Sequence, residues 1–187
     1  MWSSEGSRHL PPVATKRTGV PAALALLAVL VACSPALDWR EVRPDGSEAV
    51  VLMPCKPASH ARRVELAGSE FTWTLHACQA MGMTWGFGFA ALDDPARVDD
   101  VLRELQRSAL SHIGASDGDP MPLQVDGATP GARAARLSVQ GRLPDGRAVQ
   151  QQVAFFVRGT RVYQASVVGT VVLAEEAQTF FDSLSLR

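Results

Sequence analysis

The sequence has little net charge and lacks the basic excess that nucleic-acid binding requires. Its 187 residues include 18 lysines and arginines against 19 aspartates and glutamates, which gives a formal charge of -1. Proteins that bind phosphate backbones gain much of their affinity from a concentrated basic surface. We therefore expect no nucleic-acid partner. At this length the chain has the size of a single domain.

Motifs of the common catalytic and metal sites are also missing. The sequence contains no His-Glu-x-x-His, no Ser-x-x-Lys and no Cys-x-x-Cys, and its Gly-x-Ser-x-Gly match at residues 114–118 lies in a predicted polar loop, not between a strand and a helix. Gly86-Phe87-Gly88 lacks the third glycine of a dinucleotide-binding loop and lies within an apolar, strand-like run. These absences favour a protein that is not an enzyme, and they give no reason to expect a cofactor.

No apolar run is long enough to span a membrane, but one near the N-terminus suits export. Arg8, Lys16 and Arg17 precede an uncharged apolar run over Val20–Ala32. As a helix, this run would extend about 20 Å, which is short of the roughly 30 Å hydrocarbon core of a bilayer. A basic segment followed by a short apolar run is typical of a secretory signal. Residues 1–32 are therefore predicted to be a signal peptide.

The apolar run ends in Leu30-Val31-Ala32-Cys33, which resembles the bacterial lipobox. In that motif the cysteine is acylated and becomes the new N-terminus. The resemblance implies lipidation of Cys33 and attachment to a membrane of the cell envelope, facing the periplasm, because several acyl chains anchor a protein stably. Ser34 after the cysteine favours the outer membrane. The alternative is an ordinary signal peptide with a cysteine placed there by chance.

Cleavage before Cys33 would leave an ordinary soluble surface on the rest of the chain. It would remove three of the basic residues and one acidic residue, so that the mature chain has a formal charge of -3. Residues 33–38 are then a lipidated tether, and residues 39–187 form one folded domain. No internal repeat or long linker divides that segment.

Three cysteines are few, and with Cys33 assigned to lipid the other two form an even pair. Paired cysteines of exported proteins form disulfides, because their compartment is oxidising. We therefore predict a Cys55–Cys78 disulfide, which would close a loop of roughly 23 residues and contribute about 3 kcal/mol. The alternative is a thiol pair for redox or metal chemistry. Further soft ligands suited to copper(I) would then come from His76, Met81 and Met83.

Short apolar and alternating runs predict an antiparallel sheet. The predicted strands are 39–42, 49–53, 61–66, 71–77, 83–92, 123–125, 132–139, 148–157 and 162–168. Residues 114–122 are predicted to be a polar loop. Because alternate residues of a strand share a face, Cys78 is expected on the face opposite Trp73.

Two amphipathic helices are predicted to accompany these strands. Asp93-Asp94-Pro95 is typical of a helix start, since aspartate caps free amides and proline fits the first turn. Apolar residues then recur at helical spacing over Val98–Ile113, and again over Ala174–Leu184. Capping and a solvated helix face also account for the aspartates that could suggest a calcium site. The pattern predicts an α+β fold in which two helices sandwich an antiparallel sheet.

Several segments resemble those of PsbP-like domains and related bacterial lipoproteins. Gly159–Gly169, followed by a helix that contains Phe180-Phe181-Asp182-Ser183, resembles their last hairpin and helix. Met53-Pro54-Cys55-Lys56-Pro57 is similar to a turn near their start, and Leu37–Pro44 resembles the opening of a set of proteobacterial lipoproteins. The resemblance implies the same sandwich of sheet and helices. It implies no activity and no catalytic residues.

The leading hypothesis is a lipid-anchored, non-enzymatic module that binds another component of the cell envelope, such as a protein partner. The alternatives are a small hydrolase of unfamiliar type and a carrier of a metal or a small ligand. A hydrolase would require a nucleophile and a base in hydrogen-bond contact. A binding surface could also arise if the arginines of the C-terminal strands share one exposed face. These are Arg133, Arg136, Arg142, Arg147, Arg158 and Arg161.

Overall fold

Residues 37–130 and 134–187 are described by the structure, a computed structural model. They belong to a compact unit that the chain forms over Pro35–Arg187. The predicted signal peptide, residues 1–32, and the predicted lipidation site, Cys33, lie outside the described residues. Within the described part, no helix has the length and apolarity needed to cross a membrane.

Seven antiparallel strands form the larger of two sheets, in the order β3-β4-β5-β9-β8-β7-β6. The strands are β3 (Ala58–Leu66), β4 (Ser69–Ala80), β5 (Met83–Ala91), β6 (Asp119–Met121), β7 (Ala135–Arg142), β8 (Ala148–Arg158) and β9 (Arg161–Gly169). Tight turns join β3 to β4, β4 to β5, β7 to β8 and β8 to β9. The pairing of β5 with β9 joins the two halves of the sequence at the centre of the sheet.

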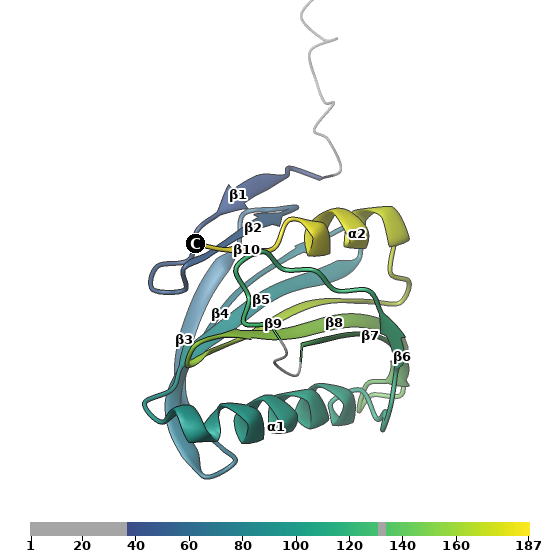
Figure 1. Cartoon of the computed structure of the whole chain (residues 1–187). Coiled ribbons are helices and arrows are strands. Elements are labelled where there is room, and N and C mark those ends of the chain that lie inside the picture. Colours follow the sequence, from purple (N-terminus) through teal and green to yellow (C-terminus); the bar gives the residue numbers. More distant parts are fainter. Residues whose placement is uncertain (1–36, 131–133) are drawn as a thin grey trace, which may run out of the picture. The chain divides into compact units, whose positions relative to one another are not determined.

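One face of the large sheet is covered by a smaller sheet and one helix, and the other face by a second helix (Figure 1). The small sheet consists of β1 (Arg40–Val42), β2 (Ala49–Met53) and β10 (Ser185–Leu186), in the order β1-β2-β10. It lies with α2 (Ala174–Asp182) on what we call the upper face. A single turn of 3-10 helix leads into α1 (Val98–Ser111), which covers the lower face. The prediction of a mixed α+β fold with antiparallel sheets and two helices is confirmed.

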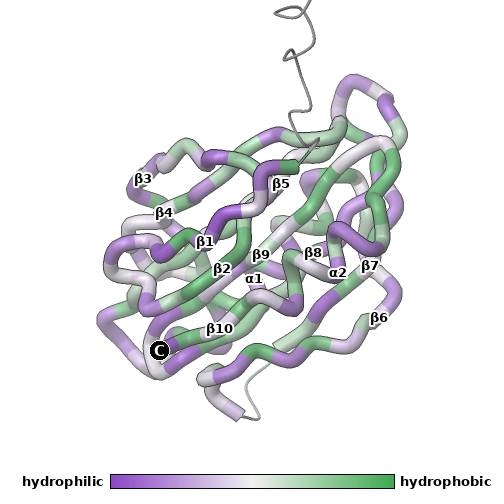
Figure 2. The backbone as a smooth tube through the Cα atoms, turned by 90° about the horizontal axis from the view of Figure 1, so that it is seen from above, coloured by the Kyte–Doolittle hydropathy of each residue, from purple (hydrophilic) through white to green (hydrophobic). Residues whose placement is uncertain are grey.

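The alternation of side chains along the strands builds one apolar core on each face. The upper core is aromatic: the rings of Trp85 on β5 and Phe180 on α2 meet edge to face at 5.5 Å between centroids. On the lower face, the apolar stripe of α1 packs on β8 and β9. Trp73 joins the lower core and Cys78 the upper one, as the alternation predicts. From above, Figure 2 shows β2 as largely hydrophobic, which fits its burial against the upper core.

Two sequence predictions in the middle of the chain are wrong. Residues 123–125 do not form a strand; Leu123 and Val125 instead pack against the upper core as an irregular segment. Residues 114–122 are not entirely a polar loop, because the strand β6 forms within them. At the edge of the sheet, β6 needs only one partner strand. An edge position also tolerates Pro120, which has no amide hydrogen to donate.

Gly88 on β5 allows an aromatic ring to lie directly across the sheet. A Cβ atom at this position would lie 2.4 Å from Cζ2 of Trp73, far inside van der Waals contact. The neighbouring Gly86 is less crowded, since its Cβ would lie 3.1 Å from the Oγ atom of Ser166. The glycine at 88 therefore sets the position of the Trp73 ring on the lower face.

Gly88→Ala is expected to lower the free energy of unfolding by about 1–3 kcal/mol, because the Trp73 ring must leave its place. Gly86→Ala is the matched control and should cost clearly less, since only a hydroxyl must move. Urea denaturation of both variants measures the difference. In a Trp73→Leu background, Gly88→Ala should lose most of its effect. Equal losses for the two glycine variants would contradict this explanation.

Candidate functional site

A cleft of about 420 Å³ lies between α1 and the lower face of the large sheet. We call it the α1 cleft. Trp73 and Leu75 of β4 and Leu105 and Ala109 of α1 give it apolar walls. Sites for small organic molecules usually have volumes of about 300–1,000 Å³ and a mostly apolar lining. The volume and lining of the α1 cleft therefore suit a small molecule.

At Gly88, β5 contributes only backbone to the lower face. Gly88 forms part of the floor, between Leu75 on β4 and Gln164 on β9 in the register of the sheet. Gly86 is two residues away and shares the same face. The Trp73 ring lies over Gly88, so backbone and an aromatic ring together bound this part of the cleft.

Polar groups stand on the floor of the cleft. Gln151 on β8 and Gln164 and Ser166 on β9 all line it. Gln151 is only 5% exposed, and its Oε1 atom has no hydrogen-bond partner among the described residues. A buried polar atom without a partner costs about 1–3 kcal/mol. A buried group of this kind calls for a partner, and at the bottom of a cleft a bound molecule can supply one.

Sequence analysis alone missed these floor residues. Three consecutive glutamines, Gln150–Gln152, interrupt the apolar strand β8. A polar run inside a central strand was the available signal, because such strands usually carry apolar residues on both faces when both are covered. Whether Gln151 has a hydrogen-bond partner on that face depends on the side chains of α1 and β9. The sequence pattern does not predict these contacts.

Two polar side chains, Arg62 on β3 and His112 just after α1, line the more exposed part of the cleft. Both are exposed. Neither has an ion-pair partner among the residues that the structure describes. Arg62 adds a fixed positive charge to this part of the cleft.

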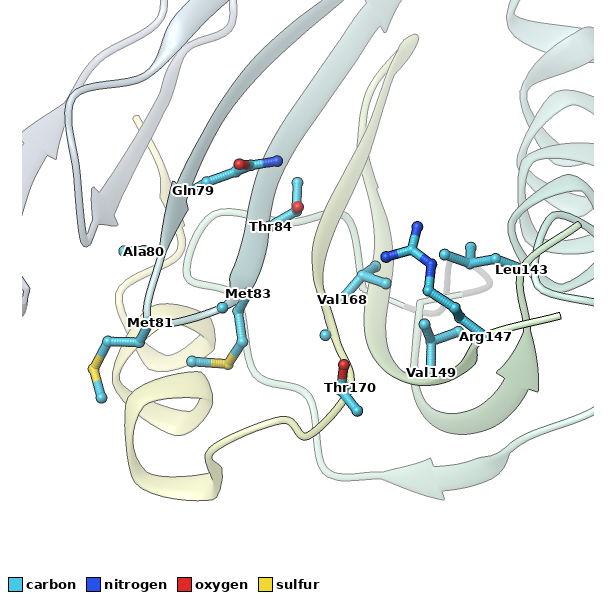
Figure 3. Close-up of a pocket in the computed structure, with 12 residues that line it drawn as sticks. Gln79, Ala80, Met81, Met83, Thr84, Leu143, Arg147, Val149, Val168 and Thr170 are labelled. Atoms are coloured by element: carbon cyan, nitrogen blue, oxygen red, sulfur yellow. The ribbon is translucent and has the colours of Figure 1, made fainter. Parts of the chain in front are cut away.

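A second pocket, of about 410 Å³, lies at the end of the sheet where the β4–β5 and β7–β8 turns approach the end of β9 (Figure 3). Met81 and Arg147 lie on opposite sides of it in this view. Arg147 donates to Asp145 at 2.7 Å, and Met83 accepts a hydrogen bond from the Leu173 amide. Within the described part of the chain, no buried atom without a partner lies here. The α1 cleft is therefore the stronger candidate.

The disulfide between Cys55 and Cys78 is present, with the two Cα atoms 6.0 Å apart. It ties the segment after β2 to β4 and packs against the upper core. A bonded sulfur is not a thiolate, so neither cysteine supplies the metal ligand that the alternative required.

The remaining members of the copper hypothesis also do not meet at one site. Met83 is buried in the upper core, whereas Met81 is 47% exposed at the β4–β5 turn. His76 stacks on Phe89 with 6.4 Å between ring centroids. No group of three or more histidine, cysteine or acidic residues placed to hold a metal is found among the described residues.

One serine–histidine contact bears on the hydrolase alternative. Ser59 Oγ on the edge strand β3 lies 3.5 Å from Nε2 of His76 on the neighbouring strand β4. Burial lowers the pKa of His76, an effect that the negative charge of Asp45 partly offsets. Burial therefore favours the neutral form of this imidazole. The pair is loose and lies near the β3 edge of the sheet, outside the α1 cleft.

The arginines of the C-terminal strands do not share one exposed face. Arg158 and Arg161 pair with Glu48 at one end of the sheet, at 3.9 and 2.9 Å. Arg142 and Arg147 belong to the β7–β8 hairpin. Arg133 lies outside the described residues. The described arginines thus form no single surface, but Arg158 and Arg161 lie together at one end of the sheet and Arg142 and Arg147 at one hairpin.

Arg136 is the exception among these arginines, because it is buried beneath α2. It is 3% exposed, and its guanidinium lies 4.0 Å from the centre of the Phe181 ring. It donates to Gln152 at 2.7 Å and to Gln178 at 3.1 Å. Burial lowers the pKa of Arg136, and the charge of Asp182 partly offsets this effect. These contacts join β7, β8 and α2, so we assign Arg136 a structural role.

The aspartates before α1 serve the helix itself. Asp94 accepts a hydrogen bond from the Ala96 amide at 2.9 Å, which confirms it as a cap. Asp100 pairs with Arg97 at 3.5 Å and with Arg103 at 3.2 Å. Capping and surface ion pairs therefore account for these two carboxylates.

Comparisons with known proteins provide no relative from which a function can be transferred. No family model matches the chain, and no curated protein is significantly similar to it. A functional assignment therefore depends on the chain's own residues.

Proposed function

We propose that this chain is a non-enzymatic binding module of the bacterial cell envelope, facing the periplasm and held at a membrane by lipid on Cys33. The observation that carries the binding role is the α1 cleft, with its apolar walls and the buried Oε1 atom of Gln151, which has no partner among the described residues. The N-terminal sequence carries the anchor: a basic segment, a short apolar run and the tetrapeptide that ends in Cys33.

Two further observations support the proposal. A disulfide suits a protein that folds in an oxidising compartment. The α+β arrangement is compatible with the proposed likeness to PsbP-like domains, a fold that would present a binding surface without prescribing an activity. Among the alternatives, a small-ligand carrier gains from the cleft, whereas a metal carrier loses its thiolate ligands to the disulfide.

The hydrolase alternative has less support. Its candidate nucleophile and base, Ser59 and His76, are 3.5 Å apart and lie outside the cleft. A hydrolase of this kind needs its nucleophile and base in hydrogen-bond contact within a pocket that holds the substrate.

Lipidation at Cys33 is expected to place the protein in the membrane fraction. Bacteria that express the full chain should incorporate an alkyne-labelled fatty acid into it. Cys33→Ser should abolish both the label and membrane retention, because no other anchor is proposed. Cys55→Ser is the matched control and should keep the label. A labelled Cys33→Ser variant, or an unlabelled wild type, would refute the anchor.

A further inference from the structure

We propose that the α1 cleft selects small, planar, largely apolar molecules that carry one N–H or O–H donor, and that Gln151 recognises this donor. The inference rests on the proposed binding function and specifies the class of ligand. It follows from the shape of the cleft, the chemistry of its walls and the buried acceptor without a partner on its floor.

Trp73 and Gly88 determine the shape of the bound molecule. The Trp73 ring is held across the position where Gly88 has no side chain, so one wall of the cleft is a flat aromatic surface. Leu105 and Ala109 of α1 supply aliphatic surface to the same space. Flat rings pack well against an aromatic face, and aliphatic groups complete their burial. A planar apolar body therefore fits this space.

Gln151 determines which polar group the ligand carries. Its Oε1 atom is buried and accepts no hydrogen bond from any described residue. A carboxamide oxygen only accepts, so the complementary ligand group is a donor. The last torsion of a glutamine side chain is soft, which lets the amide turn toward the cleft. A ligand without a donor would leave this acceptor unpaired and lose affinity.

The surroundings of Gln151 explain why the protein itself does not satisfy it. On the neighbouring strands its partners in the register are Val168 and Val139, neither of which offers a side-chain donor. The adjacent residues Gln150 and Gln152 face the other way and are engaged, with the Val172 amide and with Arg136. Of the three consecutive glutamines, the one that lines the cleft is thus the one left unpaired.

Indole is a suitable probe because it combines a flat apolar body with one N–H donor. The unit of residues 35–187 holds both sheets and all three core clusters, so it can be produced alone. Two-dimensional NMR first checks that each variant is folded and then follows titration with indole or 1-methylindole, which lacks the donor. Indole is expected to shift the signals of Trp73, Gln151 and Ser166, and to bind about tenfold more tightly than 1-methylindole.

Gln151→Leu separates recognition from folding. It should reduce the affinity for indole about tenfold, to that of 1-methylindole, and raise the melting temperature by about 2–4 °C because an unpaired polar atom is removed. Ser108→Phe should block the cleft from α1. Ser111→Phe, one turn further along the same helix and outside the cleft, should not affect binding.

The outcomes distinguish this inference from the proposed function. Equal binding of indole and 1-methylindole within the cleft would overturn the role of Gln151 and leave the binding function standing. No shifts with either probe, or shifts confined to the Met81 pocket, would overturn the α1 cleft as the binding site. Lower thermal stability of Gln151→Leu would show that this amide has a structural role instead.

Discussion

Replacement of Cys55 and Cys78 together by alanine is expected to lower the free energy of unfolding by about 3 kcal/mol. The disulfide closes a loop of sequence separation 23, and opening it restores conformational freedom to the unfolded chain. For a domain of this size, the melting temperature should fall by about 6–12 °C. Urea denaturation and calorimetry of the unit of residues 35–187 measure both quantities.

Reduction provides an independent control for the disulfide. A reducing agent should shift the wild-type transition close to that of the double alanine variant, and it should leave the variant unchanged. A loss below about 1 kcal/mol in both experiments would mean that the unfolded chain is not restrained by this link, contrary to the loop-closure argument.

Arg136→Ala is expected to cost about 3 kcal/mol, because several buried contacts disappear together. The guanidinium bridges Gln152 and Gln178 and covers the ring of Phe181. Its removal leaves the mostly buried amide of Gln152 without a donor and opens space under α2. Arg136→Lys should restore only part of the stability, since an ammonium does not match the flat contact with the ring.

Arg142→Ala is the matched control, because Arg142 lies on the same strand and is exposed. Its guanidinium donates to the Gly146 carbonyl in the adjacent turn. The cost should be within about 0.5 kcal/mol of zero. Similar losses for the two alanine variants would show that burial under α2 does not account for the role of Arg136.

The sequence predicts the regular elements of this fold well where the pattern is long and unambiguous. The apolar stripe of α1 and the cap at Asp94 were visible in the order of residue types. The alternation along β4 correctly assigned Trp73 and Cys78 to opposite faces. These features depend on local chemistry and on periodicity, which a single sequence contains.

Short strands and the cleft depend on long-range packing and were not predictable in the same way. β10 has only two residues, and it forms a strand because it pairs with β2, which is distant in the sequence. The sequence pattern gives no sign that Arg136 is buried, because its burial depends on contact with α2, a distant segment of the chain. Gln151 could not be identified from the sequence, because its distinguishing feature is a buried Oε1 atom without a hydrogen-bond partner. Only the positions of all its neighbours reveal that feature.

The intact mass of the protein extracted from its native membranes, with and without reduction before thiol alkylation, tests the anchor and the disulfide together. The proposal predicts residues 33–187 plus acyl chains, with two cysteines alkylated only after reduction. A soluble species without acyl chains would contradict the anchor. Two thiols that react without reduction would contradict the disulfide, and with it the account of the protein as an oxidised module of the cell envelope.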